Sequence, residues 1–394
     1  MIVTTPFRSR PEILCISLLF VLSLLSSCHK ETTLTDNNSM EKDLDFGLIF
    51  EKFWDGMNRN YVMWDIDSTD WSKLRQSYGP AFSRLDIKDP KDRLMAVGYL
   101  QQMTAGLKDA HFMLEFDDPQ LWPRQQSPAD ERLKLRTDYH RPFAADYFDR
   151  IARKYLDQPF YDAYYHTDLT HQLAYKAGTI KQQILYFRMN AFAIQRAYQH
   201  DQGRMKTLLD YVFTSLADPH LKGLILDLRD NTGGDLRDLN FLIGRLIDKP
   251  LTYGYSRYKL GNNPLDYSPW MPAIIRPIPN SRAYAKKIVV LLNMYSISMA
   301  ELTAMALNRL PNTTLVGERT YGANGMLAEA VELNGGSFAV PDFVRVNMAS
   351  ALFKYADQQI YESIGFPPTV VVPHKQTATD TDGQLEAAIQ LITP

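Results

Sequence analysis

Cysteine is almost missing from this chain of 394 residues. The two that occur are Cys15 and Cys28, and the long remainder has none. A disulfide, a thiolate zinc site and a cysteine nucleophile are therefore excluded from everything after Cys28. No His-Glu-x-x-His motif occurs, and His166 and His171 form no recognisable zinc pattern. We expect neither a metal nor another cofactor.

An excess of charge of either sign is missing as well. Lysine and arginine total 43, aspartate and glutamate total 45, and the net charge is −2. This balance gives no reason to expect nucleic acid or an anionic membrane surface as a partner. Hydrophobic residues make up 45% of the chain, which is enough for a large core, and the length suggests two or three structural units.

The apolar run at residues 13–25 is too short to span a bilayer comfortably as a permanent helix. It follows Arg8 and Arg10, so it has the basic start and apolar middle of a secretory signal peptide. The run ends in Leu25-Ser26-Ser27-Cys28, and small residues directly before a cysteine resemble a bacterial lipobox.

The lipobox resemblance implies cleavage before Cys28 and acylation of that residue, which would anchor the protein to a membrane. We expect residues 1–27 to be a lipoprotein signal peptide and the polar, aperiodic residues 28–44 to be a flexible tether. The expected location is the bacterial cell envelope, on the periplasmic or surface face of the outer membrane. An ordinary signal peptide with a chance cysteine is the alternative.

The first part of the mature chain carries apolar residues at helical spacing. Phe46, Ile49 and Phe50 lie on one helix face, and residues 45–116 are predicted to form an N-terminal helical domain. Residues 117–179 contain several prolines and many tyrosines, without a repeat or a low-complexity tract. This middle segment has no clear period, so its fold is left open.

From residue 180 onward, strand and helix patterns alternate. Residues 221–228 are almost wholly apolar, as expected of a strand covered on both faces of a sheet. The other predicted strands are 183–189, 287–292 and 315–317, and the predicted helices are 204–216, 236–247 and 299–310. Repeated alternation predicts a layered α/β core over residues 180–394.

Ser298 lies where one of these strands gives way to a helix. Its hydroxyl is expected at the carboxyl end of the sheet, where α/β folds bind ligands. The helix N-terminus offers free N–H groups and a positive partial charge that favour an oxyanion. Alternatively, Ser298 is only the N-cap of a capping box completed by Glu301. No Gly-x-Ser-x-Gly elbow occurs, which disfavours the α/β-hydrolases.

The turn after residues 221–228 reads Arg-Asp-Asn-Thr-Gly-Gly and ends in Gly233 and Gly234. Paired glycines permit positive φ and let the backbone approach a substrate closely. Their N–H groups could stabilise a tetrahedral oxyanion. Taken alone, two glycines after a strand indicate only a turn.

Together the two segments resemble the tail-specific (C-terminal processing) and tricorn-like serine peptidase family. In that family an Asp-Leu-Arg-x-Asn-x-Gly-Gly turn precedes a Ser-x-Ser-x-x-Glu segment, matched here by residues 227–234 and 296–301. Residues 316–322 resemble the family's Gly-x-x-Thr-x-Gly segment. The motifs run in the family's order over roughly residues 184–372.

This resemblance implies a layered core of the ClpP/crotonase type and an enzyme that needs no cofactor. It implies that Ser298 is the nucleophile that forms an acyl-enzyme. It also implies an oxyanion hole made by N–H groups of Gly233 or Gly234 and of Met299. The substrate would be a peptide or an unfolded protein tail.

The activating base differs from that of many family members. They place a lysine directly after Thr-x-Gly, where this chain has Ala323. The tricorn-like branch uses a histidine in Leu-x-Asp-Gly-His, which Leu107-Lys108-Asp109-Ala110-His111 resembles. That branch orients its histidine with the glutamate of Glu-x-x-Gly-x-x-Pro, matched by residues 362–368. We expect His111 to be the base and Glu362 the orienting acid, against the alternative of a packed or surface histidine.

The predicted function is that of a membrane-tethered serine peptidase hydrolysing peptides or protein tails. Many relatives grip substrates with a PDZ domain, but residues 117–179 are few and lack a Gly-Leu-Gly-Phe-like loop, so no standard PDZ domain is expected. Two alternatives stay open. The chain could be a catalytically silent peptide- or lipid-binding lipoprotein of the same fold, or an esterase or acyltransferase that uses the same site.

Overall fold

The computed structural model describes residues 44–118, 120–121, 125–166, 172–201, 203–327, 335–375 and 381–394. The predicted signal peptide, Cys28 and nearly all of the predicted tether lie outside the described residues. The chain divides into two units, Met1–Asp43 and Leu44–Pro394, and the second is described here. In the described ranges no helix has the length and apolar character needed to cross a membrane.

The helices are α1 (Phe46–Asn60), α2 (Trp71–Phe82), α3 (Pro90–Thr104), α4 (Pro128–Lys134), α5 (Tyr147–Tyr155), α6 (Ile194–His200), α7 (Arg204–Ser215), α8 (Arg237–Ile243), α9 (Met299–Leu307) and α10 (Gly383–Ile392). The strands are β1 (Met113–Phe116), β2 (Gln125–Gln126), β3 (Tyr161–His166), β4 (Gln172–Ile180), β5 (Ile184–Met189), β6 (Gly223–Asp227), β7 (Leu251–Tyr258), β8 (Met271–Ile275), β9 (Lys287–Leu292), β10 (Thr313–Gly317), β11 (Phe338–Val340), β12 (Val344–Asn347), β13 (Ala351–Tyr355) and β14 (Val370–Val371).

The N-terminal helices α1, α2 and α3 do not form a purely helical unit. The apolar face of α1 is buried, as its spacing predicts. It packs in one cluster with residues of β1 and β12, and the Phe46 and Phe343 rings lie 5.6 Å apart. These strands belong to an antiparallel sheet of order β11-β12-β1-β2. Segments from both ends of the chain therefore share this core.

The main sheet has seven strands in the order β14-β10-β9-β6-β5-β4-β3. Strands β5, β6, β9, β10 and β14 run parallel, while β4 and β3 pair antiparallel at one edge. The predicted strands and helices of the core appear at their expected places, with ends that differ by a few residues. Strands β3 and β4 also show that the last part of the middle segment joins this sheet.

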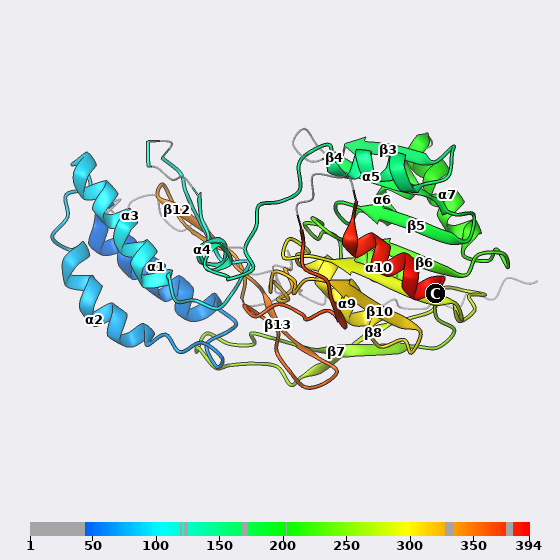
Figure 1. Ribbon diagram of the computed structural model, residues 1–394. Coiled ribbons are helices and arrows are strands. Elements are labelled where there is room, and N and C mark those ends of the chain that lie inside the picture. The colour runs from blue at the N-terminus through cyan, green and yellow to red at the C-terminus, as the bar shows by residue number, and fades with distance from the viewer. Residues whose placement is uncertain are drawn as a thin grey trace, which may run out of the picture. The chain divides into compact units, whose positions relative to one another are not determined.

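Both faces of the main sheet are covered, which explains the apolar run of β6. Leu224 and Leu226 face a cluster that includes residues of α7, α8 and α9. Ile225 faces the opposite cluster, with residues of α5 and α10. Figure 1 shows α10, in red, lying against the sheet at β6. The expectation of a layered α/β core is confirmed.

The sheet order brings the two motif segments together. Strands β6 and β9 are parallel neighbours, with Ile225 opposite Val289. Their carboxyl ends therefore meet at one edge, and the chain leaves β6 into the glycine turn and β9 into the segment before α9. Beside this edge lies a smaller antiparallel sheet, β13-β7-β8, whose β7 contacts α9.

Candidate active site

Ser298 lies between β9 and α9 in a backbone conformation that is rare for a side-chain-bearing residue. Its φ is 57° and its ψ is −113°. The capping box of Ser298 and Glu301 that the sequence offers as the alternative is present. An ordinary N-cap residue has extended backbone, so the capping role alone does not account for this conformation. Strained conformations of this kind cost about 1–3 kcal/mol and gather at functional sites. A strained serine between a strand and a helix is also the arrangement found in nucleophile elbows.

The glycine turn packs directly against this serine. A Cβ atom added to Gly233 would lie 2.7 Å from the Ser298 Cβ and 3.0 Å from the Met299 nitrogen. Gly233 has a φ of 89° and Gly234 a φ of 140°. The Asn231 carbonyl accepts a hydrogen bond from the Ile297 N–H at 2.9 Å, which joins the two segments. A glycine is therefore required at position 233 for both its conformation and its space.

The predicted oxyanion donors differ in availability. The Gly233 N–H donates to Asn231 Oδ1 at 2.9 Å, so it is already used within the turn. Within the described part of the chain, the N–H groups of Gly234 and Met299 have no hydrogen-bond partner. Gly234 is exposed and Ser298 is partly exposed. The two free donors therefore flank a serine that a substrate can reach.

Glu301, which the sequence indicated as a capping residue, has a larger structural role. Its Oε2 accepts the N–H groups of Ser298 at 3.1 Å and Ala323 at 2.7 Å. Its Oε1 accepts the Gly322 N–H at 2.8 Å and the Thr320 hydroxyl at 2.5 Å. The side chain is fully buried, and burial raises its pKa against the lowering effect of these donors. One carboxylate thus fixes the serine and the segment that follows β10.

His111 lies in the loop between α3 and β1. Its Nδ1 is buried and has no hydrogen-bond partner among the described residues. Burial lowers the pKa of His111 to about 4, so the imidazole is neutral near pH 7. The described residues provide no hydrogen bond between this ring and the Ser298 hydroxyl.

Glu362 lies near His111. Its Oε1 accepts the Ala110 N–H at 2.7 Å, and its Oε2 accepts the N–H groups of Asn324 at 2.6 Å and Gly325 at 2.7 Å. Oxygen and nitrogen atoms of Asp109, His111 and Glu362 lie within 4.8 Å of one another. The structure therefore brings His111 and Glu362 together across more than half of the sequence.

Two buried acids share this place. Burial raises the pKa of Glu362 well above its ordinary value, and the Asp109 charge raises it further. Burial also raises the pKa of Asp109, to about 6. Two carboxylates so close in a buried site disfavour each other's ionised form.

A small apolar cluster connects the histidine loop to the serine. Ala110 packs with Ala129 and Ala323, and Ile297 and Tyr321 pack against them. Ala110 precedes His111 and Ile297 precedes Ser298, so the two predicted site segments are neighbours in space. In addition, residues 322–325 donate to Glu301 on one side and to Glu362 on the other.

Comparison with known proteins agrees with this geometry. The model of Peptidase family S41 matches residues 183–372, which contain the glycine turn, Ser298, Glu301 and Glu362. Residues 183–372 of this chain are thus a match to peptidase family S41.

Similar proteins fall in the same group. The carboxy-terminal processing protease CtpA of Bacillus subtilis strain 168 is 29% identical over 200 residues, which is 50% of this chain and 39% of that protein. A carboxyl-terminal-processing protease of Synechocystis is 27% identical over 219 residues, covering 54% of this chain and 44% of the relative. The chain thus matches less than half the length of these relatives.

A solved structure extends the comparison to most of the chain. The crystal structure of a peptidase candidate from Parabacteroides merdae ATCC 43184 has a TM-score of 0.66 and 24% identity. It covers 88% of this chain and 96% of that one. At this identity the likeness establishes the fold alone.

The position after Thr-x-Gly, where many family members have a lysine, is occupied by a buried alanine. Ala323 is fully buried, and its N–H is held by Glu301. It packs with Ala110 of the histidine loop, and Ile297 packs against the same cluster. Position 323 therefore holds a small apolar side chain, where many family members have a lysine.

Asp109, His111 and Glu362 are the one group of potential metal ligands found in the described ranges. Both Asp109 oxygens accept backbone N–H groups, from His111 and Ala349 at 2.8 Å, and both Glu362 oxygens are likewise occupied. Metal ligation would compete with these bonds. The carboxylate oxygens therefore serve as acceptors for backbone N–H groups and are poorly placed to bind a cation.

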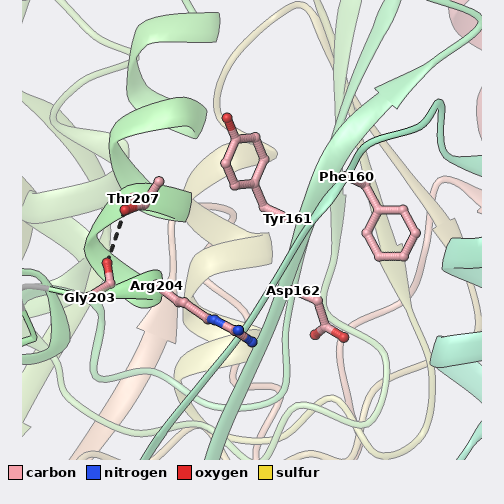
Figure 2. A pocket seen from close by; sticks show the side chains of 6 residues that line it. All are labelled: Phe160, Tyr161, Asp162, Gly203, Arg204 and Thr207. Atoms are coloured by element: carbon pink, nitrogen blue, oxygen red, sulfur yellow. Dashed lines mark hydrogen bonds between the residues drawn. The ribbon is translucent and has the colours of Figure 1, made fainter.

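A cavity lies away from the predicted site. A volume of about 570 Å³ opens between β3 and α7, beside Phe160, Tyr161 and Arg204 (Figure 2). Thr207 in its wall donates to the Gly203 carbonyl at 3.0 Å. No residue of the S41 motifs lines this cavity, so size alone does not locate the site.

Two buried carboxylates of the site have contacts that the sequence does not predict. Asp109 lies in the histidine motif, which predicts no role for it, and the sequence predicts Glu301 only as a helix cap and as the last residue of the Ser-x-Ser-x-x-Glu motif. The aspartate of the motif was the available signal for the first. For Glu301, its four donors come from residues 298 and 320–323, so only the folded chain reveals them.

Proposed function

We propose that this chain is a serine peptidase that hydrolyses peptide bonds through an acyl-enzyme on Ser298. The observation that carries the proposal is the packing of Gly233 against a strained, partly exposed Ser298 between two free N–H groups. That arrangement suits a nucleophile whose tetrahedral intermediate needs donors at a fixed place. Each such donor can stabilise the oxyanion by about 3–4 kcal/mol.

The proposed reaction has two stages. The Ser298 oxygen forms a bond to the scissile carbonyl carbon, its proton passes to His111, and Gly234 and Met299 N–H groups hold the oxyanion. The C–N bond then breaks as His111 returns the proton to the leaving amine. Water, deprotonated by His111, attacks the ester, and Ser298 recovers its proton. Glu362 is proposed to position the histidine loop through Ala110 and to stabilise the imidazolium.

The neutral state of His111 supports its role as the base. Because burial lowers the pKa of His111 to about 4, the imidazole is neutral at pH 7 and has a lone pair to offer, although burial also makes it a weaker base than a free imidazole. Position 323 is alanine, so the lysine that many family members use as the base is missing. His111 is therefore the residue that we propose as the base. The relatives named above act on carboxyl-terminal segments by name, so we propose a peptide or an unfolded protein tail as the substrate class.

Active-site labelling tests the proposal directly. A fluorophosphonate should modify the chain at Ser298, identified by mass spectrometry, and Ser298→Ala should lose both labelling and peptide cleavage. His111→Ala should slow labelling strongly. A chain that binds peptides or lipids without reacting would be the silent lipoprotein instead. Faster turnover of esters than of matched amides, with no peptide cleaved, would favour an esterase.

We also propose that the chain is tethered to the envelope through Cys28. The support is the Leu25-Ser26-Ser27-Cys28 sequence after an apolar run. Metabolic labelling with a palmitate analogue should tag the protein, and Cys28→Ser should abolish the tag and release the protein from the membrane fraction. Cys15→Ser is the matched control. Labelling that survives Cys28→Ser would contradict the tether.

A further inference from the structure

We infer that strand β3 is a docking edge at which a second copy of this chain adds its own β3, so that the two main sheets join into one. Strand β3 is the last strand of the main sheet, and in the described part of the chain its backbone bonds only to β4. In an antiparallel pair, alternate residues direct their N–H and carbonyl groups away from the neighbour. The outer side of β3 therefore offers a row of free donors and acceptors to another strand.

The two edges of this sheet are built differently. At the other edge β14 has two residues, and Pro367, Pro368 and Pro373 flank it. Short edge strands and prolines are common means of keeping a sheet from pairing with other chains. Strand β3 has six residues and reads Tyr-Asp-Ala-Tyr-Tyr-His, without proline, glycine or lysine. The β3 edge therefore lacks the protection that β14 has, and its tyrosines favour strand pairing.

The polar side chains of β3 fit a second copy of the same strand. An antiparallel pair centred on Tyr164 places Asp162 opposite the partner's His166, and two-fold symmetry repeats this pair. The Gln172 amide donates to His166 Nε2 at 3.1 Å, so the proton of a neutral ring lies on Nδ1. Among the described residues this Nδ1 has no partner, and His166 is exposed. Its N–H is therefore available to a carboxylate of another chain.

Asp162 keeps negative charge for that donor. The Lys176 ammonium lies 2.8 Å from Asp162 Oδ1 and 2.6 Å from Asp149 Oδ1. One cation between two carboxylates leaves one negative charge in excess. The Asp162 side chain is 37% exposed, whereas Lys176 is 3% exposed. The excess charge therefore lies at the open side of the strand, where the second copy is proposed to bind.

The α7 side of this edge has room for side chains of the partner. Ala163 and Tyr161 pack in the cluster that includes α7, so the odd-numbered residues of β3 face that helix. The cavity of about 570 Å³ beside Tyr161 and Arg204 lies there (Figure 2), and a hollow of about 820 Å³ continues along α7. In the proposed register the partner's Tyr165 lies opposite Ala163, a small residue. Aromatic side chains reach diagonal neighbours across a strand pair, so this ring reaches Tyr161.

Cysteine cross-linking tests the register, because the chain has no cysteine after Cys28. In the proposed pair Tyr164 lies opposite its own copy, with Cα atoms about 4.5–5.5 Å apart, which a disulfide can bridge. The full chain carrying Tyr164→Cys, oxidised in intact cells with copper phenanthroline, should run as a covalent dimer on a non-reducing gel. Leu135→Cys, at a residue 83% exposed, is the control and should stay monomeric, as should the unchanged chain.

Exchanging the charges tests the pairing itself. Added to Tyr164→Cys, His166→Asp puts two carboxylates opposite each other and should lower the cross-linked fraction about tenfold. Asp162→His removes both carboxylates and should also weaken the link, while Asp149 still holds Lys176. Differently tagged copies of these two variants restore both Asp–His pairs when they meet. Co-expression should therefore give a link between the two tags that neither variant forms alone.

Three outcomes would overturn the inference: no link through Tyr164→Cys, an equal link through Leu135→Cys, or charge variants that link as well alone as together. A Tyr164→Cys chain that links to a different protein would also overturn it and would assign the edge to that partner. Tyr164 and His166 are exposed, so urea titration should show little change in the free energy of unfolding of their variants. None of these outcomes depends on reaction at Ser298, so the peptidase proposal stands or fails separately.

Discussion

Gly233 and Ser298 touch so closely that a Cβ atom on the glycine would lie 2.7 Å from the Cβ of the serine. They are 65 positions apart in sequence, and the parallel pairing of β6 with β9 brings their segments together. The contact leaves space for a substrate carbonyl only if residue 233 has no side chain. Several expected outcomes depend on this contact and on the buried acids around it.

Gly233→Ala should destabilise the protein and abolish reaction at Ser298. The added methyl group would contact Ser298 and the Ile297 carbonyl, and the φ of 89° is unfavourable for alanine. We expect a loss of about 1–3 kcal/mol in the free energy of unfolding, measured by urea titration. Gly98→Ala is the control, because no atom lies within 4 Å of its new Cβ and helical alanine is favoured by about 0.5–1 kcal/mol. Labelling that continues in Gly233→Ala would contradict the contact.

Ser298→Gly should be more stable than Ser298→Ala, although both lack the nucleophile. Glycine adopts a φ of 57° and a ψ of −113° without the steric cost that alanine keeps. A difference of about 1 kcal/mol in the free energy of unfolding is expected from relief of strain at one residue. If the alanine variant proves the more stable of the two, then the serine backbone is not strained.

Glu301→Gln should lower kcat as well as stability. The glutamine amide has one acceptor oxygen, so it cannot replace two carboxylate oxygens that together accept four hydrogen bonds. Leaving buried donors unpaired should cost about 1–3 kcal/mol by urea titration. The kcat should fall with little change in KM, since Glu301 positions Ser298. Glu131→Gln, at a side chain 73% exposed, is the matched control and should alter neither quantity.

The pH dependence of kcat/KM should report a histidine that is hard to protonate. Burial lowers the pKa of His111 to about 4, so the acid side of the profile should fall well below the 6.5 of a free imidazole. A profile that turns down at or above pH 6.5 would argue against His111 as the base. Replacing His140, an imidazole that pairs with Glu318, should leave the acid side in place.

Stability should respond to pH through the same group. The folded-state pKa of His111 lies below its unfolded value, so the unfolded chain takes up the proton first as pH falls. Its contribution is complete above about pH 6.5 and is lost as pH falls toward 4. Asp109 has the opposite sign: its raised pKa favours folding below its ordinary value and loses that effect as pH rises toward 6. His111→Ala should remove the first component, as followed by urea titrations from pH 4 to 7.

The sequence by itself determined the local elements and the chemical identity of the reacting groups. A continuous apolar run predicted β6 because that strand is covered on both faces, and a helical period predicted α1 because that helix is covered on one. The motif residues predicted Ser298, and Ala323 in the lysine position directed attention to His111 and Glu362. These signals are local in the chain, and a sequence displays them directly.

Only the tertiary structure decided what these residues contact. Strand β1 pairs with β12, which joins residues 113–116 to 344–347. The region predicted to be a helical domain therefore consists of helices packed on a sheet. The Asn231 side chain occupies the Gly233 N–H, which leaves Gly234 and Met299 as the free donors. Asp109 meets Glu362, and Glu301 gathers donors from two separate segments. Such contacts arise from chain topology and burial, which set hydrogen bonds and pKa values but leave no periodic trace in the sequence.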